Sequence, residues 1–171
     1  MGASKQLLKW KDGTLLSHAV KTAMDSKAGR VYVVLGSNAD THRKAIATLP
    51  ITIVVNNDWN KGMGSSLKAG VAVAKQNSES ILVMTCDMPF VTSQHLNNLI
   101  KTDGDVVASE YGDAVGVPAL FSKEIFPDLL LIDDAEGAKK IISRHNPILV
   151  KLDTPADLDT PEDYQKAISA N

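Results

Sequence analysis

The sequence has little of several features that define common protein classes. Among its 171 residues there is one cysteine, Cys86, which excludes an internal disulfide framework and a tetracysteine zinc site and favours a reducing, cytoplasmic setting. No apolar run approaches the roughly 20 residues that span a bilayer, so we expect no membrane segment. The chain carries 18 lysines and arginines against 20 aspartates and glutamates, a net charge of -2. This balance gives no general attraction to nucleic acid or acidic membranes, so any phosphate ligand must be held by local groups.

Apolar strands and amphipathic helices alternate along the first half of the chain. Residues 31–35 form a continuous β-branched and apolar run, which is typical of a strand buried on both faces of a parallel sheet. Similar runs return at residues 51–55 and 81–85, and helices are predicted between these strands near residues 40–49 and 64–75. The alternation indicates βαβ crossovers and an α/β fold, which we expect to form one domain over the whole chain.

The remaining predicted elements have weaker signals. Thr14 can cap a helix whose apolar side chains share one face, with Gly29 closing the segment. Pro161 suits the first turn of a last helix, because it needs no amide partner there. Further helices are predicted at residues 93–101, 123–131 and 136–144, and extended segments at residues 106–109, 118–121 and 148–152.

The strongest local signal for chemistry is Asp87, which follows the strand at residues 81–85 and precedes a proline turn. Ligands of open α/β sheets bind at the carboxyl ends of the strands, so this carboxylate is expected in a ligand crevice. It can hold Mg²⁺, a hard cation that prefers oxygen ligands and is often shared with substrate phosphates. The alternative is an aspartate that caps the following turn, and this segment alone does not separate the two.

A second acidic cluster follows the late predicted strand. Asp157 and Asp159 alternate, so in an extended segment they would point the same way and could complete a metal site. Thr160 is instead suited to a helix N-cap, with Glu162 and Asp163 in the first turn beside the positive end of the helix dipole. We therefore interpret Glu162 and Asp163 as structural and keep Asp157 and Asp159 as candidate ligands.

A glycine-bearing loop joins a predicted strand to a predicted helix. Its glycines let the backbone approach a ligand closely, and the serines at the helix start offer hydroxyls and amides. Loops that open helices commonly look like this, so the motif alone is a weak signal. The candidate binding residues of this loop are Asn56, Gly62, Met63, Gly64, Ser65 and Ser66.

Other residues of reactive types give weaker signals of function. Gly2 and Lys5 place a glycine and a cation at a spacing that meets an oxyanion, for which a solvated lysine is the ordinary alternative. Cys86 is interpreted as a small buried residue, because the adjacent carboxylate raises the pKa of its thiol. No nucleophile is predicted. The histidines show no metal-ligand spacing and are interpreted as surface or structural residues: His18, His42, His95 and His145.

Taken together and in order, these motifs resemble the MobA-like nucleotidyltransferases, the family of the molybdenum-cofactor cytidylyl- and guanylyltransferases. Nearly the whole chain is covered, and the likeness is strongest to the cytidylyltransferase branch. Several ordered motifs are far more specific than any single one. The matching segments are residues 1–10, 59–67, 86–89, 111–121, 136–140 and 157–164.

The resemblance implies a three-layer α/β/α fold with a Rossmann-like, mainly parallel sheet of the nucleotide-diphospho-sugar transferase type. It also implies roles for the candidate residues. Lys5, as a catalytic residue, and Gly2 would contact the nucleoside triphosphate, and the loop at residues 62–66 would face the base. Asp87, the second catalytic residue, would hold Mg²⁺ with Asp159 or Asp157. The residues bordering the acceptor pocket would be Gly116, Val117, Pro118 and Lys139.

The family pattern begins with an apolar strand and a glycine-rich loop that cradles the triphosphate, and neither stands before the motif at residues 1–10. In the family this strand lies inside the sheet. Without it, ladder donors and acceptors on its two neighbouring strands would be left unpaired. We therefore expect residues upstream of Met1 to supply the strand.

The implied reaction is attack by a substrate phosphate on the α-phosphorus of a nucleoside triphosphate, with release of pyrophosphate. Positioning and charge neutralisation drive such a reaction, so metal-binding carboxylates and a lysine suffice without a covalent nucleophile. CTP is the favoured nucleotide and molybdopterin the favoured acceptor, with a molybdoenzyme or its chaperone as a further partner. The alternatives are transfer from GTP, transfer to a sugar phosphate, and a non-catalytic accessory protein that binds nucleotide or molybdenum cofactor.

Overall fold

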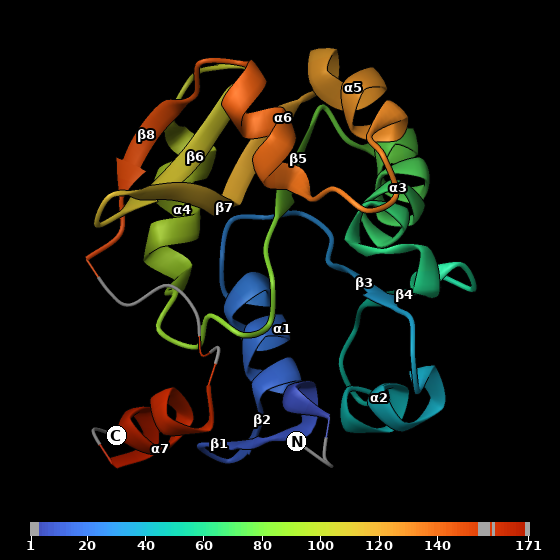
Figure 1. The fold of residues 1–171 in the computed structure, drawn as a ribbon, viewed down its shortest axis with the longest axis vertical. Helices are drawn as coiled ribbons and strands as arrows, with labels where there is room; N and C mark the ends of the chain where they lie inside the picture. The colour runs from blue at the N-terminus through green and yellow to red at the C-terminus, as the bar shows by residue number, and fades with distance from the viewer. Residues whose placement is uncertain (1–3, 154–157, 159, 170–171) are drawn as a thin grey trace.

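The computed structural model describes residues 4–153, 158 and 160–169 (Figure 1). Its strands are β1 (Lys9–Trp10), β2 (Gly13–Thr14), β3 (Tyr32–Leu35), β4 (Thr52–Val55), β5 (Ser80–Val83), β6 (Val106–Tyr111), β7 (Ala114–Ser122) and β8 (Ile148–Lys151). Its α-helices are α1 (Leu15–Met24), α2 (Ala39–Ala45), α3 (Met63–Ala74), α4 (Ser93–Lys101), α5 (Phe126–Leu131), α6 (Ala138–Arg144) and α7 (Pro161–Ser169). Short 3₁₀ turns are η1 (Lys5–Leu7), η2 (Trp59–Lys61), η3 (Lys75–Asn77) and η4 (Lys123–Ile125).

The strand pairing agrees with a mainly parallel α/β sheet. β3 and β4 pair in parallel across α2, which confirms the predicted βαβ unit. The larger sheet has the order β5-β7-β6-β8, in which β7 is antiparallel to β5 and to β6, whereas β6 and β8 are parallel. β5, β6 and β8 therefore run in one direction and β7 alone runs against them.

In the part of the chain that the structure describes, the β3–β4 pair is not hydrogen-bonded to the four-stranded sheet. Among the described strands, β3 pairs with β4 alone and β5 pairs with β7 alone, so each has one edge that meets no other strand.

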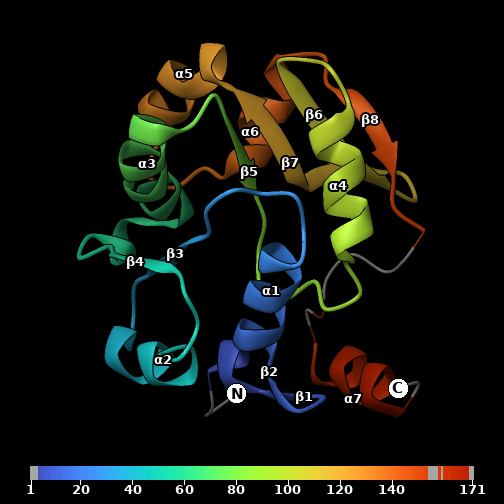
Figure 2. The ribbon, with the colours of Figure 1, turned by 180° about the vertical axis from the view of Figure 1, so that it is seen from behind.

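Helices cover both faces of the four-stranded sheet. α4 lies on one face and α6 on the other, as the opposite views in Figures 1 and 2 show. The period-two alternation of strand side chains explains why both faces are apolar. On β6, Val107 packs with α4 residues such as Leu99, whereas Ala108 packs with α6 residues such as Ile141. The predicted three-layer α/β/α arrangement is confirmed.

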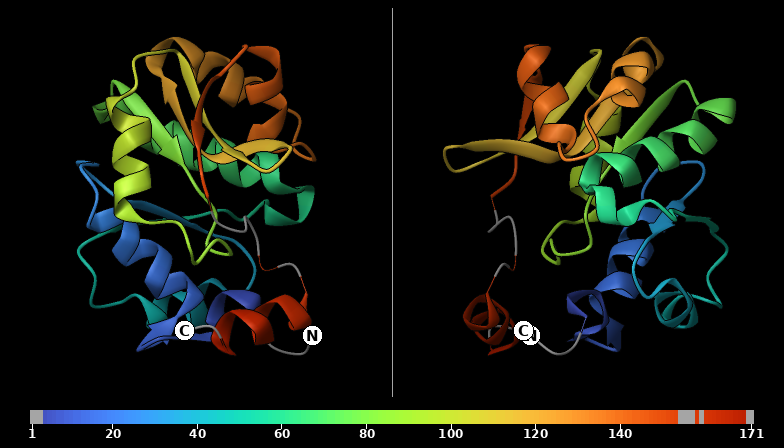
Figure 3. Two further views of the ribbon diagram at one scale, coloured as in Figure 1. Left: turned by 90° about the vertical axis from the view of Figure 1, so that its left-hand side faces the viewer. Right: turned by 45° about the vertical axis from the view of Figure 1, so that its right-hand side comes forward.

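A further group of elements gathers below this sheet. Figures 1 and 3 show the β1–β2 hairpin, the start of α1 and α7 together at one end of the molecule. The side chains of Trp10, Leu15, Leu158 and Ala167 form a small buried cluster there. The Tyr164 hydroxyl also donates to the carbonyl of Lys9 at 2.7 Å. These contacts bring the late acidic segment back to the start of the described chain.

The two predicted helix caps are confirmed. Thr14 accepts from the amide of Ser17 at 3.1 Å, and the Ser17 hydroxyl accepts from the amide of Thr14 at 2.9 Å, which is a capping box. Thr160 forms the same reciprocal pair with Asp163 at the start of α7. The hydrogen bonds from Thr160 lower the pKa of the Asp163 carboxyl below its usual value. Asp163 is therefore the structural residue that the sequence indicates.

Several element boundaries differ from the prediction. α1 ends at Met24, before the predicted stop at Gly29, and the β1–β2 hairpin has no predicted counterpart. β6 and β7 extend beyond the predicted segments and form a hairpin in which Tyr111 pairs with Ala114. Gly112 takes a φ of +59° at the first of the two loop positions, a conformation that glycine adopts readily. In the described part of the chain, no helix is both long and apolar enough to cross a membrane.

Candidate active site

Asp87 stands in the turn that follows β5, where the sequence places a ligand-binding carboxylate. Its Oδ2 accepts from the Lys5 ammonium, with 3.1 Å between Nζ and Oδ2. The two side chains are 27% and 23% exposed, so the pair sits at a partly open position. The structure thus brings together two predicted site residues that lie 82 positions apart in the chain.

The second carboxylate oxygen of Asp87 has a different environment. Oδ1 is buried and has no hydrogen-bond partner among the described residues. A buried anionic oxygen without a partner carries the full cost of its lost hydration, which a hard cation would offset. The donor chemistry at Asp87 therefore fits a divalent metal, with Oδ1 as the available ligand atom.

The late acidic segment returns to the same place. The amide of Leu158 donates to the main-chain carbonyl of Asp87 at 3.0 Å, and the Leu158 side chain is buried. The predicted ligands Asp157 and Asp159, like the predicted nucleotide contact Gly2, lie outside the described residues. Within the part of the chain that is described, no group of three or more His, Cys, Asp or Glu side chains could hold a metal ion.

The glycine-bearing loop between β4 and α3 is held together by its own polar groups. The amide nitrogen of buried Asn56 donates to the Ser65 and Ser66 hydroxyls at 2.8 and 3.0 Å. The Ser65 hydroxyl in turn reaches the carbonyls of Gly62 at 2.7 Å and Asp58 at 3.0 Å. These side chains therefore shape the loop. Met63 is the predicted contact that protrudes, with 65% of its side chain exposed.

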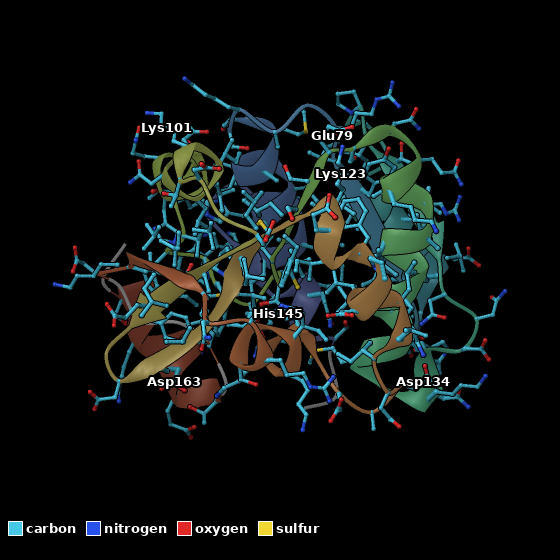
Figure 4. All side chains as sticks on the ribbon, turned by 90° about the horizontal axis from the view of Figure 1, so that it is seen from above. Glu79, Lys101, Lys123, Asp134, His145 and Asp163 are labelled. Carbon is cyan, nitrogen blue, oxygen red and sulfur yellow. The ribbon has the colours of Figure 1, made fainter. Side chains whose placement is uncertain are left out.

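The two glycines of this loop are required by its neighbour, the segment at residues 133–136. The Gly64 amide donates to the Asp134 carbonyl at 2.8 Å, and a Cβ on Gly64 would lie 2.1 Å from the Asp133 carbonyl. Gly62 has a φ of +126°, and a Cβ there would lie 2.5 Å from the Asp134 carbonyl. Lys68 of α3 forms an ion pair with the Asp134 carboxylate, and Figure 4 shows Asp134 beside this helix. No sequence motif indicates that residues 133–136 would pack here.

The predicted acceptor residues divide into buried and exposed groups. Gly116, Val117 and Pro118 lie within β7, where Pro118 is fully buried, Gly116 is buried and Val117 is half-buried. Lys139 lies in the first turn of α6 and is exposed. α6 packs against β7, so these four residues belong to adjoining elements. Their predicted contact with an acceptor stays a prediction.

The histidines act within the fold. His95 is buried and bonded to the Ser109 hydroxyl with 2.7 Å between Nε2 and Oγ, a contact that spacing along the sequence does not reveal. His18 lies 3.0 Å from the Pro89 carbonyl, and burial lowers the pKa of its imidazole. His42 is buried beside the Ser4 hydroxyl, and His145 pairs with the Asp128 carboxylate at 2.7 Å. The structural interpretation of these four residues is supported.

The comparisons with known proteins agree with this fold. Solved nucleotidyltransferases share the fold. Residues 1–148 match the MobA-like NTP transferase domain. The chain therefore belongs to the MobA-like NTP transferase family and is a nucleotidyltransferase by class.

Individual relatives carry different names. The chain is 29% identical over 168 residues to the nicotine blue oxidoreductase of Paenarthrobacter nicotinovorans, covering 93% of this chain and 82% of that protein. It is 25% identical over 170 residues to the molybdenum cofactor cytidylyltransferase of Escherichia coli K12, covering 96% and 86%. Two relatives of comparable similarity thus have different names, and family membership alone does not define the substrate.

A solved structure supports the whole fold. Rv0371c of Mycobacterium tuberculosis H37Rv superposes with a TM-score of 0.89 at 27% identity, covering 99% of this chain and 90% of that one. Its complex with manganese gives a TM-score of 0.85 at 27% identity, covering 98% and 92%.

Burial and the neighbouring Asp87 raise the pKa of the Cys86 thiol to about 11, from an ordinary value of 9.0. Because the thiolate is the reactive form, the folded protein at pH 8 should react with a disulfide reagent about 100-fold more slowly than the unfolded protein. The rate of the folded protein should rise with pH beyond 9 and level off only near 11. Stopped-flow absorbance with Ellman's reagent, in buffer and in guanidinium, measures both rates. A plateau at pH 9 in the folded protein would contradict this environment for Cys86.

Proposed function

We propose that this protein transfers a nucleotidyl group from a nucleoside triphosphate to a phosphate-bearing acceptor, with the help of a divalent cation. The observation that carries the proposal is the Asp87 carboxylate, which binds the Lys5 ammonium through one oxygen and keeps the other buried and unpartnered among the described residues. A carboxylate and a lysine at the end of a strand are the charges that such a transfer needs.

Lys5 supplies the positive charge on the protein side. Its ammonium lies 3.1 Å from Asp87, so a triphosphate bound beside this carboxylate would come within reach of Lys5. An ammonium is a compact point charge with three donors, and it can move from a carboxylate to a phosphate oxygen without a change in its own protonation. Lys5 would then neutralise charge that builds on the departing pyrophosphate.

Asp87 Oδ1 would be one metal ligand, and Asp159 or Asp157 would be another. The Leu158 amide supports this choice, because Leu158 stands between these two aspartates in the sequence and donates to the main-chain carbonyl of Asp87. The manganese complex of Rv0371c supports a divalent ion in the family, and Mg²⁺ is the ion we expect here. When bound, the metal supplies charge neutralisation to the substrate phosphates.

The two substrates would occupy opposite sides of Asp87. The loop at residues 62–66 follows β4 and would contact the nucleotide, whereas Gly116 and Val117 of β7 would border the acceptor. β5, which leads to Asp87, lies beside β7 in the sheet. Lys139 is exposed on α6 and would approach an acceptor phosphate from solvent.

CTP and molybdopterin are the substrates we favour. The likeness to the molybdenum cofactor cytidylyltransferase of Escherichia coli supports both, and a molybdoenzyme or its chaperone would then receive the product. Transfer from GTP, transfer to a sugar phosphate, and a non-catalytic role in binding nucleotide or cofactor are the alternatives that the assay below separates.

Pyrophosphate release is the direct test. The protein is incubated with Mg²⁺, either molybdopterin or a sugar phosphate as the acceptor, and CTP, GTP or ATP, and a coupled assay follows pyrophosphate. We expect release with CTP to exceed that with GTP or ATP. The Asp87→Asn variant should lower this release at least about 100-fold, because it weakens metal binding where charge develops in the transition state.

Glu79→Gln is the matched control for Asp87→Asn. Glu79 is exposed and pairs with Lys123 at 2.6 Å (Figure 4). It immediately precedes β5, whereas Asp87 follows that strand. Its removal should leave turnover within about twofold of the wild type, because surface ion pairs contribute little. Normal turnover in Asp87→Asn would contradict the metal assignment. Release with the sugar phosphate alone would favour that acceptor, and no release with any nucleotide and either acceptor would favour the non-catalytic alternative.

A second prediction concerns the binding of the metal ion at Asp87. Because Lys5 occupies one oxygen of Asp87, it repels and competes with a metal ion, so Lys5→Gln should bind Mn²⁺ more tightly in the absence of nucleotide. Removing a charge repulsion worth about 1 kcal/mol corresponds to about fivefold in affinity. The same variant should bind CTP more weakly at saturating Mn²⁺. Calorimetric titration measures both, with Lys123→Gln as control, and weaker Mn²⁺ binding by Lys5→Gln would refute the competition.

A further inference from the structure

The β6–β7 ladder contains a bulge at the predicted acceptor residues. Ala108 pairs with Ala119, but the next residue, Ser109, pairs with Gly116. Val117 and Pro118 therefore stand on β7 without a partner residue on β6. This is a β-bulge, a feature that re-aims backbone and side chains near active sites.

The same two residues also leave the ladder on the other side. β5 pairs with β7 from Ser80 opposite Ser122 to Val83 opposite Ala119, and the pairing stops there. The chain continues from Val83 through residues 84–86 to Asp87. The bulge is therefore beside the segment that delivers the metal-binding carboxylate, and the Val117 backbone lies outside both ladders.

A buried chain of hydrogen bonds holds this bulge. The Ser109 hydroxyl donates to the Pro118 carbonyl at 2.6 Å, and Ser109 is fully buried. A carbonyl can only accept, so the one hydroxyl proton of Ser109 is used there, and His95 Nε2 must donate to Ser109 Oγ at 2.7 Å. This series of hydrogen bonds thus links His95 of α4 to Ser109 of β6 and Ser109 to Pro118 of β7.

The chemistry of His95 suits this fixed direction. Burial lowers the pKa of its imidazole, so the ring is neutral near pH 7 and carries a single proton. That proton lies on Nε2, because Nε2 donates to Ser109. The neutral ring therefore holds Ser109 in the orientation that serves the Pro118 carbonyl.

The neighbours of the bulge leave it little other freedom. Val117 contacts both apolar clusters of the sheet, one on each face. A Cβ added to Gly116 would lie 2.4 Å from the Tyr111 hydroxyl, so the aromatic ring closes over this backbone. The position of residues 116 and 117 is thus set by packing on both faces and by the hydrogen bond to Pro118.

We propose that His95 and Ser109 are positioning residues for the acceptor: through the Pro118 carbonyl they hold the bulge so that the backbone of Gly116 and Val117 faces the acceptor beside Asp87. This inference rests on the proposed function, since it assumes that residues 116–118 border the acceptor. Both side chains are buried, so they would act through the Pro118 carbonyl rather than by contact with a substrate. The loop between β4 and α3, which would contact the nucleotide, makes none of the hydrogen bonds that link His95, Ser109 and Pro118.

The test separates binding of the two substrates. In Ser109→Ala, with molybdopterin as the acceptor, we expect the KM for molybdopterin to rise about tenfold and the KM for CTP to stay within about twofold. His95→Gln retains an N–H donor and should lie close to the wild type, whereas His95→Leu should resemble Ser109→Ala. Ser17→Ala removes another buried serine hydroxyl, which bonds with Thr14 at the start of α1. This variant is the control and should change neither KM.

Hydrogen exchange gives a readout that does not depend on turnover. Amide exchange at residues 114–117 should be about tenfold faster in Ser109→Ala and unchanged in Ser17→Ala. Equal changes in both KM values, or unchanged exchange at the bulge, would overturn the positioning role. If the wild type releases no pyrophosphate with molybdopterin, the proposed function fails and the acceptor part of this inference with it, while exchange still decides whether the chain holds the bulge.

Discussion

The arrangement of the site depends on how the carboxyl group and main chain of Asp87 are held. Lys5 binds one carboxylate oxygen and the Leu158 amide binds the main-chain carbonyl, so the start and the late part of the described chain converge on the turn after β5. An ion pair that is about one quarter exposed adds about 1 kcal/mol or less to stability. Its importance is therefore positional, because it places a cation and a carboxylate within one hydrogen-bond length.

The sheet explains why such a site can accept two substrates. β5 ends at Val83, four residues before Asp87, and β7 runs beside it, whereas the glycine-bearing loop follows β4 of the other sheet. Glycines let the loop after β4 pack closely on residues 133–136. A bulge shapes β7. Under the proposed function, backbone geometry rather than a cluster of reactive side chains would form the walls of the site, as suits a reaction governed by positioning and charge.

Local patterns predicted the elements that depend on local forces. The Thr14 cap and the bounds of α4 at Ser93–Lys101 follow from side-chain propensities and helical spacing, and they are confirmed. The sequence predicts Asp87 as a site residue because an apolar strand ends shortly before it. The proximity of Lys5 to Asp87 was implied by family resemblance alone, since no periodic pattern relates residues so distant in the chain.

Long-range packing accounts for what the sequence did not reveal. The contact of Gly64 with Asp134 and the chain from His95 to Pro118 join segments whose own residues look ordinary. A register shift in a ladder leaves no compositional trace, so the bulge at Val117 could not be predicted from β-propensity. Nor does the sequence alone distinguish the buried His95 from a surface histidine, because its partner Ser109 lies on another element.

In the proposed reaction an acceptor phosphate oxygen forms a bond to the α-phosphorus of a nucleoside triphosphate, and the bond from the α-phosphorus to the oxygen that bridges it to the β-phosphorus breaks. The most direct measurement uses CTP labelled with ³²P at the α or at the γ position, with Mg²⁺ and molybdopterin, followed by separation of the products. We predict that the α label appears on the acceptor and the γ label in pyrophosphate. Transfer of the γ label to the acceptor, or retention of both labels in CTP, would contradict it.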